Sequence, residues 1–151
     1  MGRVVIPFGG VYDATKFALE AINESLSYEL KPLGVAVSIV QPGPFATELV
    51  QKVILPSNLS IVNEYGVTAQ LLGNFLESYT KLMQDSNLPN KPQQVADAIL
   101  ELIETPNGKR PLRVVVDKIT GDAAKVINET ANDVQHQVLK NFSLEKLLST
   151  Y

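Results

Sequence analysis

The chain has 151 residues, 45% of them hydrophobic, and carries a formal net charge of −3 at pH 7. One domain is expected at this length, and the apolar content is enough to build a core. The charge balance offers no basic surface for nucleic acid, and the absence of cysteine excludes disulfides, thiol catalysis and most zinc sites. No apolar run has the length of a membrane span, and we expect no signal segment. We therefore expect a cytoplasmic protein with neither a nucleic-acid partner nor a bound metal.

The first third of the chain predicts a loop followed by a long helix. Residues 3–8 could form a short strand, but Pro7 and the two glycines that follow favour a loop. A helix is expected over residues 11–30, and Pro32 and Gly34 end it. One apolar stripe on this helix is formed by Leu19, Ile22, Leu26 and Leu30. A second apolar face consists mostly of small residues. Two apolar sides predict that other elements cover the helix on both faces.

A buried strand is predicted over residues 35–40. Nearly all of its residues are apolar and β-branched ones dominate, which is typical of a strand buried on both faces of a parallel sheet. Pro42, Gly43 and Pro44 follow, and they prevent further pairing. Ligands of open parallel sheets bind beyond the carboxyl ends of the strands, where this turn would lie. The alternative is a plain loop that only ends the strand.

The middle of the chain, residues 48–91, has a weaker pattern. It predicts a short helix over 48–55, a turn over 56–60 and a longer helix over 68–84, in which apolar residues recur at helical spacing. This apolar stripe either packs into the core or forms the wall of a binding site for an apolar molecule.

The last third predicts a helix over 92–104, a strand over 112–116 and a helix over 122–141. Pro92 suits the first turn of its helix. Strand, long helical crossover and strand form a right-handed βαβ unit. The expected fold class is therefore α/β, with about two parallel strands and four to five helices in one domain over residues 1–151. The only histidine, His136, lies off the apolar side of the last helix and is assigned no role.

Tyr12 and Lys16 carry the chemistry that the sequence suggests. They stand four residues apart in the first turns of the long helix, so phenol and ammonium leave it on one side, about 6 Å apart along the axis. A free tyrosine has a pKa of about 10 and transfers protons poorly near neutrality. A nearby cation favours the phenolate and lowers that pKa. The pair predicts a proton-transfer group; the alternative is an ordinary polar pair at a helix start.

The sequence around this pair resembles a known family. Residues 12–21, YDATKFALEA, are similar to the active-site helix of the short-chain dehydrogenase/reductase family, whose motif is Tyr-x-x-x-Lys. The strand over 35–40, the Pro42-Gly43 turn and Thr47 are similar to the next strand of that family and its Pro-Gly-x-x-x-Thr pattern. The resemblance is clear over the first third of the chain, and the layout of the rest is compatible with it.

The resemblance implies an NAD(P)-dependent oxidoreductase acting on a small, apolar carbonyl compound or alcohol. Tyr12 would donate or accept the proton, and Lys16 would activate Tyr12 and hold the nicotinamide ribose hydroxyls. Residues 48–91 would contain the substrate lid. The nicotinamide end of the cofactor, NAD or NADP, would be contacted by Pro42, Gly43, Phe45, Ala46 and Thr47.

One large departure from the family is visible. No Gly-rich phosphate-binding turn of the form G-x-x-x-G-x-G occurs in the 151 residues, and no strand–helix unit precedes Tyr12. The catalytic serine and the structural asparagine of the family would lie before residue 1. We therefore expect the C-terminal portion of a Rossmann-like doubly wound parallel sheet, an incomplete domain without its dinucleotide-binding half. Such a chain is expected to be inactive on its own.

Two other hypotheses remain open at this point. The chain could be a non-catalytic fragment that associates with a partner or with itself through an exposed sheet edge and its first helix. It could also be an intact small α/β protein in which the Tyr-x-x-x-Lys spacing is fortuitous. Binding of NAD(P)H would separate the oxidoreductase from both, and gel filtration would separate the other two.

Overall fold

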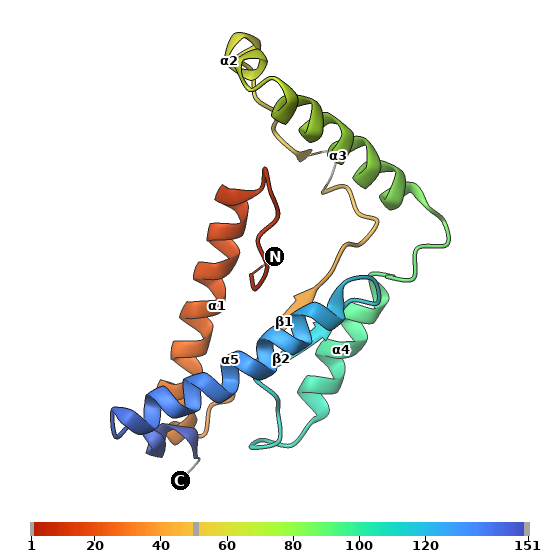
Figure 1. Cartoon of the computed structure of the whole chain (residues 1–151). Helices are drawn as coiled ribbons and strands as arrows, with labels where there is room; N and C mark the ends of the chain where they lie inside the picture. Colours follow the sequence, from red (N-terminus) through yellow and green to blue (C-terminus); the bar gives the residue numbers. More distant parts are fainter. Residues whose placement is uncertain (1, 50–51, 150–151) are drawn as a thin grey trace.

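The computed structural model describes residues 2–49 and 52–149. These residues form five α-helices, two short 3-10 helices and two β-strands (Figure 1). The elements, in chain order, are α1 (Gly10–Leu30), η1 (Lys31–Leu33), β1 (Ile39–Pro42), α2 (Leu59–Glu64), α3 (Val67–Gln84), α4 (Gln93–Glu104), β2 (Arg113–Val116), α5 (Gly121–Asn141) and η3 (Glu145–Leu148).

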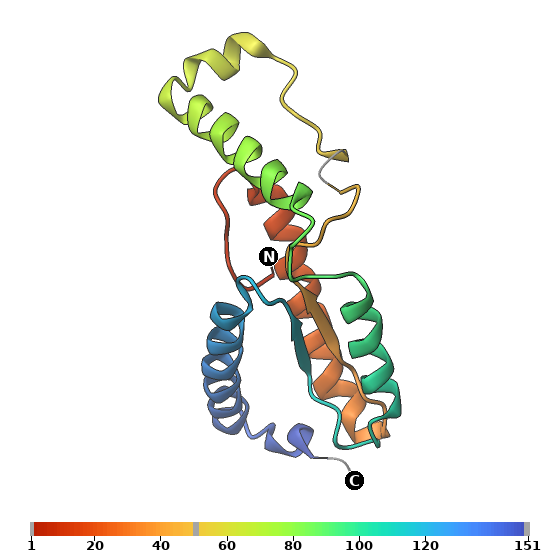
Figure 2. The same ribbon diagram turned by 90° about the vertical axis from the view of Figure 1, so that its right-hand side faces the viewer.

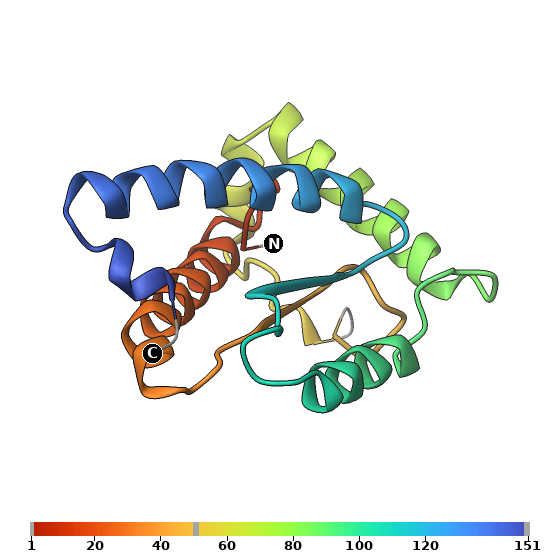
Figure 3. The same cartoon turned by 90° about the horizontal axis from the view of Figure 1, so that it is seen from below.

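The two strands form a parallel sheet, as expected for an α/β fold. Ile39 of β1 lies opposite Arg113 of β2, and the register continues to Pro42 opposite Val116. Helices cover both faces of this sheet: α4 packs on one side and α5 on the other (Figure 3). The predicted fold class, with two parallel strands joined by a helical crossover, is therefore confirmed.

The first strand is shorter than predicted and shifted along the chain. A strand over 35–40 was expected, whereas β1 begins at Ile39 and includes Pro42. In the observed register, the residues before Ile39 would face the segment before Arg113, which is occupied by the turn at Lys109 and by Pro111. A turn and a residue without an N–H cannot continue a ladder. Pairing therefore starts only where β2 starts.

The helices α2 and α3 form an arm that projects from the carboxyl end of the sheet (Figure 2). The predicted helix over 68–84 is confirmed as α3. The predicted turn over 56–60 is wrong in part, because Asn58 caps a helix: its side-chain oxygen accepts hydrogen bonds from the backbone N–H groups of Ser60 and Ile61. Of the predicted helix over 48–55, residues 50–51 lie outside the described residues and 53–55 are not helical.

The prediction that α1 is covered on both faces is wrong for the described residues. Leu19 is 50% exposed and Ile22 is 59% exposed, although both belong to its apolar stripe. The buried residues of α1 are instead two acids, Asp13 and Glu20. The strands are also less buried than predicted, since Ile39 is the one residue of β1 and β2 that is buried. Elsewhere the buried apolar side chains are Met83, Leu88 and Leu139.

Candidate active site at the start of α1

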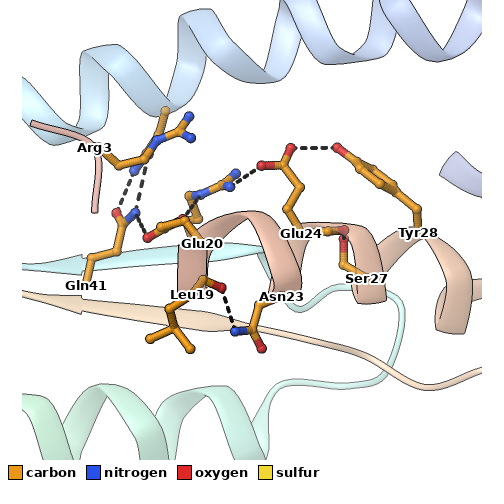
Figure 4. Close-up of polar contacts among 10 residues, drawn as sticks. Arg3, Leu19, Glu20, Asn23, Glu24, Ser27, Tyr28 and Gln41 are labelled. Atoms are coloured by element: carbon orange, nitrogen blue, oxygen red, sulfur yellow. Dashed lines mark hydrogen bonds and ion pairs between the residues drawn. The ribbon is translucent and has the colours of Figure 1, made fainter. Parts of the chain in front are cut away.

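A buried ionic network holds α1 against the sheet (Figure 4). The Arg113 Nε donates to Glu20 Oε2 at 2.9 Å, and the same guanidinium also pairs with Glu24. Only 6% of the Arg113 side chain is exposed. Burial alone would lower the pKa of this guanidinium, but its hydrogen bonds to the two glutamates hold that pKa above its usual value. A buried guanidinium is tolerated because it is paired.

The same network also reaches strand β1 and helix α5. Gln41 on β1 donates from Nε2 to Glu20 Oε1 at 2.7 Å, and Asn128 on α5 donates from Nδ2 to Gln41 Oε1 at 2.7 Å. Tyr28 donates its hydroxyl to Glu24 Oε1 at 2.8 Å, and burial together with this hydrogen bond raises the pKa of Tyr28 above its usual value. Polar side chains from α1, both strands and α5 therefore fix the rotation of α1 about its own axis.

Tyr12 and Lys16 lie in the first two turns of α1, where Tyr12 is exposed and Lys16 is half-buried. The Lys16 Nζ lies 5.2 Å from the centroid of the Tyr12 ring, within the range of a cation–π contact. The predicted proximity of the two side chains is thus confirmed. The cation lies over the ring face, and 44% of Tyr12 is exposed. Their roles in proton transfer remain predictions.

Asp13 is a buried residue of this region that the sequence analysis did not single out. It is 2% exposed, and its Oδ2 accepts a hydrogen bond from the backbone N–H of Ile6 at 2.8 Å. The backbone N–H of Gly9 donates a hydrogen bond to Ile6 O at 3.1 Å, which closes a turn in this loop. Asp13 therefore fastens the segment before α1 to the helix, directly beside Tyr12. The predicted loop over 3–8 is confirmed.

A second polar cluster fixes the turn after β1. Asn90, which is 1% exposed, donates from Nδ2 to Pro44 O at 2.8 Å and to Asp117 Oδ1 at 2.9 Å, and its Oδ1 accepts from Lys118 N. Burial alone would raise the pKa of the Asp117 carboxyl, but hydrogen bonds from Thr120, Asn90 and two backbone N–H groups hold that pKa below its usual value. Asn90 and Asp117 thus tie the two strand ends together.

At Gly43 the turn after β1 approaches the residue after β2 closely. Its backbone N–H donates to Val116 O at 3.1 Å, and a Cβ atom at this position would overlap the Asp117 side chain. Sequence reasoning missed Asn90 and Asp117. Asp117 could have been found, because it is the first polar residue after a predicted parallel strand, at the edge where such sheets bind ligands. Asn90 carries no comparable signal.

The remaining predicted site residues follow this turn. Phe45 is half-buried, Ala46 and Thr47 are exposed, and the Thr47 hydroxyl accepts from Leu49 N at 3.5 Å. The start of α1 and the carboxyl ends of both strands lie at the same end of the molecule (Figures 1 and 2). The hydrogen bonds found among the described residues do not join the side chains of Tyr12 or Lys16 to the segment 42–47. The structure brings the two halves of the predicted site to one end of the molecule, and no hydrogen bond among the described residues joins these side chains to that segment.

Other kinds of site find no support in the described residues. They contain no grouping of three or more acidic or histidine side chains that could hold a metal ion. No helix among them is both long enough and apolar enough to cross a bilayer. A hollow of about 420 Å³ lies between α1, α5 and η3, but none of the predicted site residues lines it.

Comparison with known proteins relates the chain to one family of oxidoreductases. Residues 1–57 match the family model described as short chain dehydrogenase. The chain is 32% identical over 115 residues to retinol dehydrogenase 8 of Bos taurus, a match that covers 75% of this chain and 36% of that protein. It is 31% identical over 106 residues to human 17-beta-hydroxysteroid dehydrogenase type 1, covering 70% of this chain and 31% of the relative.

A bacterial relative gives the same result. The 3-ketodihydrosphingosine reductase of Bacteroides thetaiotaomicron is 29% identical over 106 residues, which cover 70% of this chain and 37% of the reductase. In each case the match spans little more than a third of the relative at most. The chain therefore resembles part of a short-chain dehydrogenase, and its first 57 residues carry the family signature.

The close approach at Gly43 makes a prediction about stability. Gly43→Ala should lower the free energy of unfolding by about 1–3 kcal/mol, because the added methyl group must displace Asp117 or the turn. Gly73→Ala is the matched control: it lies inside α3 with open space around it, and should raise stability by about 0.5–1 kcal/mol. Urea unfolding followed by circular dichroism measures both. Equal stability of the two variants would show that Gly43 does not lie close to the Asp117 side chain.

Proposed function

We propose that this chain is the C-terminal portion of an NAD(P)-dependent short-chain dehydrogenase/reductase, and that it carries the proton-transfer groups of the enzyme. One observation carries the proposal. The contact between Lys16 and Tyr12 occurs on the exposed start of α1, inside the segment that matches the family model. An exposed phenol beside a cation is open to substrate and is placed to exchange a proton with it.

Tyr12 would donate a proton to the oxygen of a carbonyl substrate, or accept one from an alcohol in the reverse direction. Lys16 would favour the ionised phenol through its charge, which lies 5.2 Å from the ring centroid. The ionic network around Arg113 supports this role indirectly. Because it fixes the rotation of α1, Tyr12 and Lys16 keep a constant orientation relative to the strand ends.

A nicotinamide cofactor, NAD or NADP, would supply the hydride. The donors at this end of the molecule, near the start of α1, fit such a group. The Lys16 ammonium suits ribose hydroxyls, and the Thr47 hydroxyl suits a carboxamide. The turn formed by Pro42, Gly43, Phe45 and Ala46 would face the nicotinamide. Asn90 and Asp117 hold this turn in place and so would orient it toward the cofactor.

The substrate would be an alcohol or a carbonyl compound with an apolar body. The relatives named above act on retinol, a 17-beta-hydroxysteroid and 3-ketodihydrosphingosine, which share an alcohol or ketone group. The α2–α3 arm would be the lid over such a molecule, and its exposed apolar side chains Leu71 and Phe75 are consistent with an apolar substrate.

The catalytic proposal predicts different losses for its two residues. In an enzyme that contains this chain together with a nicotinamide-binding segment, Tyr12→Phe should lower kcat by about a hundredfold or more, with cofactor affinity nearly unchanged, because only proton transfer is lost. Lys16→Ala should weaken both turnover and cofactor binding. Steady-state kinetics and cofactor titration measure these effects.

The matched controls are Tyr65→Phe and Lys81→Ala, which make the same changes at exposed positions on the α2–α3 arm. Both should leave kcat unchanged. If Tyr12→Phe turns over as fast as Tyr65→Phe, the assignment of Tyr12 is wrong.

A second proposal concerns self-association, which would give a homo-oligomer. The stripe of α1 presents Leu19, Ile22 and Leu26 to solvent, and β1 leaves one edge of the sheet unpaired in the described residues. An exposed apolar helix face and an open strand edge are both surfaces that other chains cover.

Self-association through α1 can be tested with two isoleucines. Ile22→Glu should weaken dimerisation at least tenfold, because a charge would be buried in the contact. Ile54→Glu is the control, because Ile54 is 95% exposed and lies outside the helices. Sedimentation equilibrium at micromolar concentrations measures the dimer. A monomeric unmodified chain, or equal effects of the two changes, would refute this interface.

A further inference from the structure

A second hollow lies at the end of the sheet opposite to the candidate active site. Its walls come from the two segments that lead into the strands, 31–37 before β1 and 107–112 before β2, and Asn132 and His136 of α5 also line it. Because the strands are parallel, both segments lie at the amino ends of the strands (Figure 1). The hollow has a volume of about 270 Å³, and none of the residues predicted for the active site lines it.

The side chains that line this hollow carry positive charge and no negative charge. Lys31 and Arg110 are cations, and His136 can donate a hydrogen bond in either protonation state. Neither an aspartate nor a glutamate of the described residues lines the hollow, although the whole chain carries a net charge of −3. The ion pairs found in the described part of the chain include none of these three side chains. A hollow lined by one sign of charge attracts ligands of the other sign.

Arg110 is held at the hollow by the end of α4. Its Nε donates to Thr105 O at 2.8 Å, and its Nη2 donates to Ile103 O at 3.1 Å. Both acceptors are backbone carbonyls at a helix C-terminus, where the macrodipole contributes roughly −0.5 charge. A guanidinium carries a full positive charge, so the end of α4 offsets only part of it. The hydrogen bonds among the described residues leave Nη1 unused, and its two N–H groups can bind a ligand.

Hydrogen bonds between the two leading segments hold the walls of the hollow together. Asn107 Nδ2 donates to Gly34 O at 2.6 Å, and Ser38 Oγ donates to Pro111 O at 2.8 Å. Gly34 ends η1 with a φ of 76°, in the left-handed region that glycine adopts readily, and so turns the chain from α1 toward β1. These contacts are present without a ligand, so binding does not have to order the walls first.

The residues before β1 add backbone donors and apolar surface. The N–H groups of Ala36 and Val37 make no hydrogen bond among the described residues, because the ladder with β2 begins only at Arg113. The side chains of Val37, Leu112 and Leu148 are half-buried and line the hollow. Donors for an anion and apolar surface for a short carbon chain therefore occur together.

We propose that this hollow binds a small organic carboxylate with a short apolar tail, at a site separate from the candidate active site. The free N–H groups of Arg110 donate to the carboxylate, whose two oxygens match the planar guanidinium. Lys31 adds a second positive charge, and the half-buried apolar side chains contact the tail. The inference does not depend on proton transfer by Tyr12, so either proposal can fail without the other.

Titration of the whole chain with sodium hexanoate at constant ionic strength, followed by ¹H–¹⁵N NMR spectra, tests the inference. The backbone amide signals of Ala36 and Val37 should shift and saturate at millimolar concentrations, while the signal of Tyr12 stays in place. 1-Hexanol has the tail without the charge, and acetate has the charge with almost no tail. Each should bind at least about tenfold more weakly than hexanoate, because each lacks one of the two interactions.

Two lysines give a matched pair of variants. Lys31→Met removes a charge from the hollow and should weaken hexanoate binding by about three- to tenfold. Lys109→Met makes the same change at an exposed neighbour of Arg110 that does not line the hollow, and it should bind hexanoate as the unmodified chain does. Arg110→Lys keeps the charge but loses the planar donor group, so it should also weaken binding.

Three results would overturn the inference. The first is the absence of saturable shifts when hexanoate is added to the unmodified chain. The second is equal affinity for hexanoate and either 1-hexanol or acetate, which would remove the charge or the tail from the recognition. The third is hexanoate binding that is as tight in Lys31→Met as in Lys109→Met.

Discussion

The fold depends on a guanidinium buried between two elements that are far apart in the sequence. Arg113 opens β2 and pairs with Glu20 and Glu24 of α1, about ninety residues earlier. Removing these charges from water is costly, and the cost is offset only while all three side chains keep their partners. Since the apolar stripe of α1 faces solvent, the polar contacts contribute much of the free energy that keeps this helix packed on the sheet.

This constraint explains how a weakly covered helix can still present a site. The network acts in the middle of α1, and the first two turns extend beyond it with Tyr12 exposed and Lys16 half-buried. Asp13 then fixes the preceding loop, and a separate cluster of Asn90 and Asp117 fixes the turn after β1. The two sides of the candidate site are thus held by independent polar contacts at one end of the molecule, and the α2–α3 arm reaches this end through aromatic contacts.

Local patterns in the sequence predict the fold better than they predict burial. Helical periodicity gives α1, α3, α4 and α5 nearly to their ends, and the β-branched runs give both strands in parallel order. The same patterns fail for Leu19 and Glu20, neighbours on α1 whose burial is the reverse of what hydropathy suggests. An acid on a helix is expected to be solvated, and nothing nearby in the sequence indicates that Arg113 will reach it.

Strand length and the candidate site show the same contrast between features set by a local sequence pattern and features set by contacts with distant segments. The run at 35–40 is apolar enough for a longer strand, but a strand can extend only as far as its partner. The partner, β2, does not begin until Arg113, after Pro111. Tyr12, Lys16 and the turn at Gly43 are predictable because a short spacing carries their chemistry. Asp13 and Asn90 are not predictable, because each acquires its place from a contact with a different segment of the chain.

Urea unfolding of Arg113→Met is the most direct test of the central claim that this network holds α1 on the sheet. Removing the guanidinium leaves the carboxylates of Glu20 and Glu24 without their cation, so the free energy of unfolding should fall by about 3–5 kcal/mol. Lys81→Met is the control, since its ion pair with Glu77 is exposed and should contribute at most about 0.5 kcal/mol. A loss in Arg113→Met no larger than that in Lys81→Met would contradict the claim.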